Sequence, residues 1–329
     1  MEQKVEDLIA KSQVIKKDEY SQNGWDFKFQ TSGIMTSDEL DQLTDYLTMN
    51  IAPDVVFGKN LARLENKEHN FVLEFNPRDS LRFSNFKARE TRLIKDQSEL
   101  QHRSKEFNHI NIIPKEVKIR QASIWKNKKV DPEIASEIKE IQQFSDCFFS
   151  TPYKGTVKTM NQDPKYERDY YKKEAETAIS KEEVAENDYP YCIATDDKIP
   201  LENLTQENPI KWHSMVYQWE DELDDNGHTT SEFRFRVMGD CFFGLLRHYL
   251  RLDDVVVRIY DTRIYHDFKW NYILREFMVK EDSYENIMAK GFQFTPKWMI
   301  DPGQSHLIAP YVKETYNFKD KIYFCPPKN

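Results

Sequence analysis

Glycine and positive charge are both scarce in this sequence, and their scarcity excludes several classes of protein. Only 9 of the 329 residues are glycine, which argues against glycine-rich phosphate-binding loops and dinucleotide-binding folds. The 47 lysines and arginines are outnumbered by 56 aspartates and glutamates, giving a net charge of −9. A nucleic-acid-binding protein would present a basic surface instead. No P-loop, HExxH motif or nucleophile elbow is present.

Cysteine pairs and long apolar runs are missing as well. The four cysteines lie far apart at positions 147, 192, 241 and 325, which disfavours the common zinc sites and a disulfide framework. No run approaches the roughly 18 apolar residues of a membrane span, and the charged N-terminus is unlike a signal peptide. We therefore expect a cytoplasmic or nuclear protein with reduced thiols, no cofactor and no membrane or nucleic-acid partner.

Two charged stretches interrupt an otherwise apolar pattern. Residues of about 90–143 and 161–188 are rich in Lys, Glu, Gln and Asn, with few apolar positions. Such segments bury too little apolar surface to offset the entropy lost on ordering. We expect one domain over 1–329 that carries these two stretches as surface insertions, with a flexible N-terminal segment at about 1–20.

Between the insertions, alternating apolar residues predict strands. Residues 71–75 alternate, and so do 215–219 and 233–237, which flank an Asn226-Gly227 turn and predict a hairpin. The valine run before Asp261 predicts a strand that ends near this residue, and 270–282 could form another strand. The pattern indicates an α+β fold with a mostly antiparallel, sandwich-like sheet and packed helices.

Three helices are predicted from capping residues and helical spacing. Thr36 and Glu39 form a capping box ahead of apolar residues spaced as one helical face. Asn76 and Pro77 suit the N-cap and first position of a short helix that has Asp79 at its third position. The segment 241–251 carries apolar residues at helical spacing after Gly239-Asp240, which predicts a third helix.

The most enzyme-like cluster is Asp261, His266 and Glu276, which could in principle form a metal-dependent hydrolase site. However, Asp261 shares strand parity with Ile259, whereas His266 has the opposite parity, so the three would converge only at a bulge. Asp261 could instead pair with Arg263 or Arg258 at the end of its strand. A third possibility is a scaffold protein that acts through its charged insertions.

Several long motifs resemble those of a known protein family. The chain carries WEDELDDNG at 219–227, FRVMGDCFFGLLRHYLRLDDVVVR at 235–258 and DTRIYH at 261–266. EFNPRDSL at 74–81 and YKGT at 153–156 agree as well. Together these motifs resemble the TIP-forty-one-like family, also described as TOR signalling pathway regulator-like. Two positions depart from its pattern, because Asp254 replaces a glycine and Ile259 replaces a residue that is often methionine.

This resemblance implies a regulator without catalytic activity. Members of the family bind the catalytic subunits of type 2A-like serine/threonine phosphatases (types 2A, 4 and 6), act downstream of TOR kinase and, in fungi, associate with the Tap/alpha-four phosphatase-associated subunit. The partner-binding residues that carry over by motif are Asp79, Ile199, Ile259 and Asp261. We expect Asp261 at the rim of the sheet, where its carboxylate can meet an arginine or backbone N–H groups of a partner.

Overall fold

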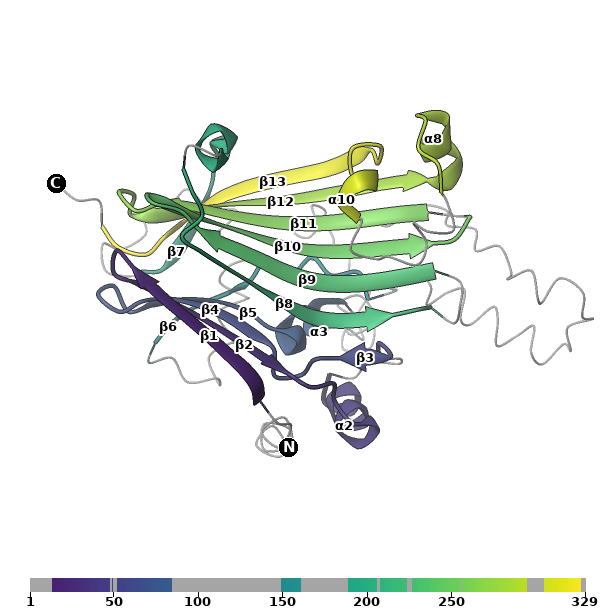
Figure 1. Cartoon of the computed structure of the whole chain (residues 1–329), viewed down its shortest axis with the longest axis horizontal. Helices are drawn as coiled ribbons and strands as arrows, with labels where there is room; N and C mark the ends of the chain where they lie inside the picture. Colours follow the sequence, from purple (N-terminus) through teal and green to yellow (C-terminus); the bar gives the residue numbers. More distant parts are fainter. Residues whose placement is uncertain are drawn as a thin grey trace, which may run out of the picture.

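The chain folds into two packed antiparallel sheets (Figure 1). A computed structural model describes residues 14–47, 49, 52–84, 149–160, 189–205, 208–223, 227–254, 256–294 and 305–326. The two charged insertions lie outside the described residues, as do residues 1–13 of the segment expected to be flexible. Residues 14–20 of that segment belong to a strand, β1 (Val14–Gln22).

The small sheet has five strands in the order β1-β2-β4-β5-β6 within the described ranges. Its other strands are β2 (Trp25–Ser32), β4 (Leu61–Asn66), β5 (Phe71–Phe75) and β6 (Thr156–Thr159). Two helices follow its strands, α2 (Ser37–Leu47) and α3 (Pro77–Ser84). Both begin as their caps predict: Thr36 N–H donates to Glu39 over 2.8 Å, and the Asn76 side chain accepts from Asp79 N–H over 2.8 Å.

The large sheet has eight strands in the order β3-β8-β9-β10-β11-β12-β13-β7, again counting described residues. They are β3 (Val55–Val56), β8 (Trp212–Asp221), β9 (Gly227–Val237), β10 (Cys241–Leu252), β11 (Val256–Asp267), β12 (Tyr272–Ser283), β13 (Glu314–Tyr323) and β7 (Tyr191–Ala194). The β8–β9 pair confirms the predicted hairpin. From β8 to β13, each strand pairs with its neighbour in sequence.

The face of the large sheet that packs on the small sheet, here called the inner face, is aromatic. Phe75 of β5 stacks on Phe233 with 4.1 Å between ring centroids, and Trp25 of β2 meets Phe242 edge-on at 5.1 Å. Gly244 leaves the space for this packing, because a Cβ there would lie only 2.7 Å from the Phe233 ring. The alternation read from residues 71–75 and 233–237 thus reflects one shared core.

The opposite, outer face of the large sheet carries two apolar clusters at its two ends. The helices α8 (Tyr284–Ala289) and α10 (Ser305–Ile308) lie at one end (Figure 1). They pack on Tyr249, Val257 and Ile259. At the other end, the chain around the short 3-10 helix η3 (Leu201–Leu204) packs on Cys241 and Tyr265. We call these the α8–α10 cluster and the η3 cluster. Charged side chains lie between them.

The helix predicted over 241–251 is wrong, because this segment is the central strand β10. Gly239 and Asp240 form the turn between β9 and β10, where Met238 N–H donates to the Cys241 carbonyl. Strand β10 is covered on both faces, with Leu246 in the inner core and Tyr249 in the α8–α10 cluster. A strand buried on both faces carries apolar residues at consecutive positions and does not alternate between apolar and polar residues. A subset of these positions also fits the spacing of one helical face, so the sequence pattern did not distinguish the two structures.

Candidate partner-binding site

The centre of the outer face is a buried ion pair between β10 and β11. Arg247 and Asp261 lie directly opposite each other in the register of the two strands. The guanidinium donates from Nε and Nη2 to the two carboxylate oxygens, each over 2.7 Å. Burial alone would lower the pKa of Arg247, but the Asp261 carboxylate outweighs it and raises this pKa. The pair is bidentate and rigid.

The position expected for Asp261, at the rim where its strand ends, is therefore wrong. Asp261 lies in the middle of β11 and is only 2% exposed. The pairing alternatives considered from sequence are also only partly right, because Arg263 lies 3.7 Å away as a secondary partner and Arg258 pairs with Glu281. The main partner, Arg247, lies on β10, the segment for which the sequence predicts a helix.

Around this pair, alternating charges run across four strands of the outer face. Arg234 of β9 contacts Glu232 over 2.7 Å, and Arg263 of β11 lies 3.6 Å from Glu276 of β12. We call the set Glu232, Arg234, Arg247, Asp261, Arg263 and Glu276 the charged band. Arg234 and Arg263 have 45% and 25% of their side chains exposed, so these two cations bring the band to the surface.

The two isoleucines singled out by motif flank the charged band, one in each apolar cluster. Ile259 is fully buried beneath α8 and α10, two residues before Asp261 on the same strand face. Ile199 is buried in the η3 cluster with Met238 and Tyr265. Both side chains hold the covering segments against the sheet.

Asp79 lies apart from the other three, on the inner side of the large sheet. Its carboxylate accepts from Thr156 of β6 over 2.6 Å and from Asn76 over 2.9 Å, and Arg78 Nε lies 3.5 Å away. Burial would raise the pKa of Asp79, but the charge of Arg78 and the Thr156 hydroxyl lower it further than burial raises it. Asp79 therefore joins α3 to β6 and does more than cap its helix.

The structure thus brings Ile259 and Asp261 together, places Ile199 on the same face and leaves Asp79 on the other. All four side chains are buried. The groups that reach the surface, Arg234 and Arg263, were missed as site residues from sequence. A signal was present for Arg263, because it is the last residue of the DTR motif.

The hydrolase triad does not assemble. Asp261 and Glu276 both face outward near Arg263, whereas His266 points into the inner core between Trp25 and Phe242, each with its ring centroid 5.0 Å away. Burial lowers the pKa of His266 to about 4, and Nδ1 lies 2.8 Å from the Tyr272 carbonyl. In the described part of the chain, no three His, Cys, Asp or Glu side chains are grouped as metal ligands.

The two departures from the motif pattern have clear positions. Asp254 lies in the β10–β11 turn with φ of +60°, a left-handed conformation that glycine adopts most easily. The turn that a glycine would make is therefore kept, because aspartate tolerates this region better than most residues. Ile259 fills its place in the α8–α10 cluster without exposure.

None of the described helices is long and apolar enough to cross a membrane.

The chain is similar in sequence to several known proteins. Residues 55–288 match the TIP41-like family. A TIP41-like protein of Rattus norvegicus is 28% identical over 296 residues, which cover 90% of this chain and 87% of the relative. A TIP41-like protein of Dictyostelium discoideum is 30% identical over 263 residues, covering 80% and 78% of the two chains. The type 2A phosphatase activator TIP41 of Saccharomyces cerevisiae is 28% identical over 269 residues, covering 82% and 64%. The chain therefore belongs to the TIP41-like family.

Proposed function

We propose that this protein is a non-catalytic regulator that binds the catalytic subunits of type 2A-like serine/threonine phosphatases, of types 2A, 4 and 6. The observation that carries the proposal is family membership over residues 55–288, together with the yeast relative named as a type 2A phosphatase activator. By the same resemblance, the protein acts in TOR signalling in the cytoplasm or nucleus, and the Tap/alpha-four phosphatase-associated subunit is a second partner.

We propose that the phosphatase contacts the charged band of the outer face. Asp261 and Ile259 are too buried to meet a partner, so their role is to position the exposed cations. Asp261 fixes Arg247 by two hydrogen bonds and attracts Arg263 at 3.7 Å. Ile199 and Ile259 keep the two flanking clusters in place on either side. Asp79 contributes from the inner side, by anchoring α3 to β6.

The deciding experiment is a direct binding measurement with purified proteins. The full chain is immobilised, and a purified type 2A catalytic subunit is titrated over it by biolayer interferometry. Saturable 1:1 binding supports the proposal, and loss of binding in Arg263→Gln places the contact on the charged band. Lys16→Gln on β1 is the matched control, since Lys16 is exposed and lies on the small sheet.

The scaffold alternative is separated by a deletion in the same assay. A chain lacking residues 161–188 is expected to bind the catalytic subunit like the wild type, because the charged band does not involve this segment. If the deletion abolished binding while Arg263→Gln had no effect, the insertion would be the contact and the band would not. Absence of binding by the full chain to catalytic subunits of all three phosphatase types would refute the proposed function itself.

A further inference from the structure

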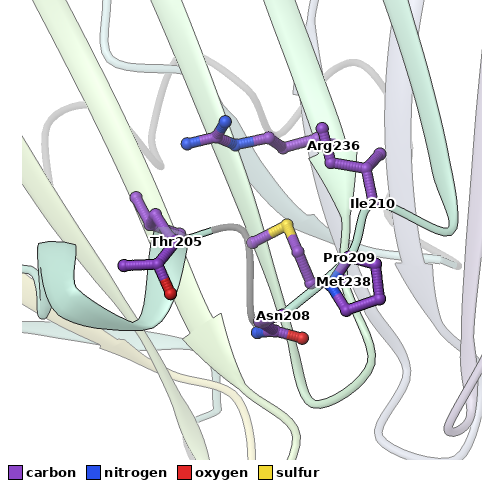
Figure 2. Close-up of a pocket in the computed structure, with 7 residues that line it drawn as sticks. Thr205, Asn208, Pro209, Ile210, Arg236 and Met238 are labelled. Atoms are coloured by element: carbon purple, nitrogen blue, oxygen red, sulfur yellow. The ribbon is translucent and has the colours of Figure 1, made fainter.

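A pocket opens on the outer face, where residues 204, 205 and 208–210 lie beside the end of β9 (Figure 2). Its volume is about 340 Å³, and its apolar lining comes from Leu204, Pro209, Ile210 and Met238. Figure 2 shows Met238, Pro209 and Ile210 along one side, with Thr205 facing them. Arg236 of β9 supplies the charged wall. We call this space the Arg236 pocket.

The walls of the Arg236 pocket are fixed by hydrogen bonds. Asn208 donates to the Asn203 carbonyl over 3.1 Å and to Asp240 over 2.6 Å, and its side-chain oxygen accepts from Gly239 N–H over 3.0 Å. Asn203 in turn donates to the Tyr265 hydroxyl over 2.9 Å. These bonds tie Asn208 to the β9–β10 turn, so little conformational entropy is lost when a ligand enters.

Arg236 is the unusual group in this pocket, because its charge has no counter-ion among the described residues. Its Nε is buried without a hydrogen-bond partner, and its guanidinium lies over the Phe243 ring at 5.2 Å. By contrast, Arg247 and Arg275 elsewhere in the large sheet each hold a carboxylate. A buried guanidinium nitrogen without an acceptor is costly, and a carboxylate is the acceptor whose geometry fits it.

The surface around the pocket fits the same kind of ligand. Ile210 is 51% exposed at its edge, and Met215 is 39% exposed on the neighbouring strand β8. Arg234 adds a second cation on the outer face of β9, two residues before Arg236. Positive and apolar groups are thus concentrated here in a protein whose net charge is −9. The nearby Asp240 is already engaged by Asn208.

We propose that the Arg236 pocket binds a short segment of a partner protein in which an Asp or Glu stands beside a bulky apolar residue. The carboxylate accepts from the Arg236 guanidinium, and the apolar side chain fills the space between Ile210 and Met238. This docking site adjoins the charged band, to which Arg234 belongs, but its ligand is held by Arg236, whereas the proposed phosphatase contact depends on Arg263. Charge complementarity selects an acidic segment over a basic or neutral one.

The test uses fluorescence anisotropy with the full chain and a fluorescein-labelled peptide of sequence GSELELSG. We expect saturable binding that weakens at high salt, since the contact is a charge pair near the surface. The neutral peptide GSQLQLSG is expected to bind at least tenfold more weakly. Equal affinity for the two peptides, or no binding of GSELELSG up to 1 mM, would overturn the proposal.

Variants then locate the contact. Arg236→Gln is expected to weaken GSELELSG at least tenfold, and Arg236→Lys to recover only part of this, because lysine lacks the planar pair of donors. Ile210→Ser, a change at an exposed position that leaves the fold intact, is expected to weaken binding about fivefold, as removal of a buried apolar contact would. The control Lys211→Gln should change affinity less than twofold. Unchanged binding in both Arg236→Gln and Ile210→Ser would rule out this pocket.

The protein's own acidic segment is a competing occupant that the same assay detects. If deletion of residues 161–188 raised the affinity for GSELELSG at least tenfold, the pocket would be filled by the chain itself. That result would overturn the assignment to a partner protein. Unchanged affinity supports it.

Discussion

The two faces of the large sheet each bury an arginine–aspartate pair, and the two pairs have the same chemistry in different surroundings. On the inner face, Arg275 donates to Asp320 over 2.9 and 2.5 Å, and both residues are at most 3% exposed. On the outer face, Arg247 donates to Asp261 over 2.7 Å twice, but this pair lies beside Arg263, whose side chain is partly exposed. Each pair joins residues directly opposite in the register.

The difference indicates what each pair does. Arg275 lies against the apolar core and also donates to the Lys154 carbonyl, so it fixes β12 to β13 and to the segment before β6. Arg247 lies between the two apolar clusters, and its partner Asp261 lies 3.7 Å from Arg263. A substitution in this pair is therefore expected to change the position of the partly exposed Arg263 side chain. Buried pairs of this kind are costly to break but add little over an apolar replacement. Single variants that remove one partner can therefore be compared with double variants that replace both. The comparison separates the effect on folding stability from the effect on partner binding.

The largest effect is expected at the inner pair. Asp320→Asn should lower the free energy of unfolding by about 3–5 kcal/mol, because the Arg275 charge stays buried without its carboxylate. Urea denaturation at pH 7 measures this change. The double variant Arg275→Met with Asp320→Leu is expected to recover most of the stability. A single variant that unfolds at the wild-type urea concentration would show that water already reaches Arg275.

A smaller loss of stability is expected at the outer pair. Asp261→Asn should cost about 2–3 kcal/mol, since Arg247 keeps the attraction of Glu232. It should also weaken phosphatase binding, because Arg263 loses its inner anchor. The double variant Arg247→Met with Asp261→Leu is expected to restore stability but not affinity. If affinity returned together with stability, the pair would matter only for folding.

Acid is expected to destabilise the inner face through His266, whose folded-state pKa of about 4 lies below the ordinary value of 6.5. The unfolded chain gains the proton first, so stability is fully present above about pH 6.5 and falls as the pH drops toward 4. Between pH 7 and 5 this amounts to about 2 kcal/mol. His266→Phe should remove this part of the pH dependence, measured as the slope of unfolding free energy against pH. If His266→Phe left this slope unchanged, the pH dependence would come from other titratable groups.

The smallest effect on stability is expected at Arg263, on the surface of the charged band. Arg263→Gln should change the free energy of unfolding by less than about 1 kcal/mol, as for other partly exposed ion pairs. Affinity for the phosphatase catalytic subunit should fall at least fivefold. Arg263→Lys is expected to be intermediate, because it keeps the charge without the planar donors. Wild-type affinity in Arg263→Gln would move the proposed contact away from the band.

The sequence was sufficient where a local signal decides the structure. The caps at Thr36 and Asn76 predicted two helix starts, and the alternation at 233–237 predicted a hairpin strand, because these features depend on neighbouring residues. The strand β10 was missed because coverage of both its faces comes from segments far away in the chain, such as α8 and α10.

The site was predictable only in part, for the same reason. Motifs marked Asp261, but its burial follows from Arg247, which belongs to the misassigned segment. The sequence predicts Asp79 only as a capping acid, whereas the structure shows that it also accepts a hydrogen bond from Thr156 of β6. The Arg236 pocket forms because residues 204, 205 and 208–210 lie against β9, and hydrophobic periodicity does not predict this contact. Pairing across distant segments was the missing information in each case.

The order of strands in the two sheets has a consequence for synthesis of the chain. The small sheet ends with β6 at Thr159, whereas its apolar partner face is complete only after β13 at Tyr323. At ribosomal rates this interval lasts about 8–33 s. During it, Trp25, Phe27 and Phe29 have no complete large sheet to cover them. We expect nascent chains stalled near residue 200 to recruit holding chaperones, and chains released from the ribosome beyond β13 to shed them.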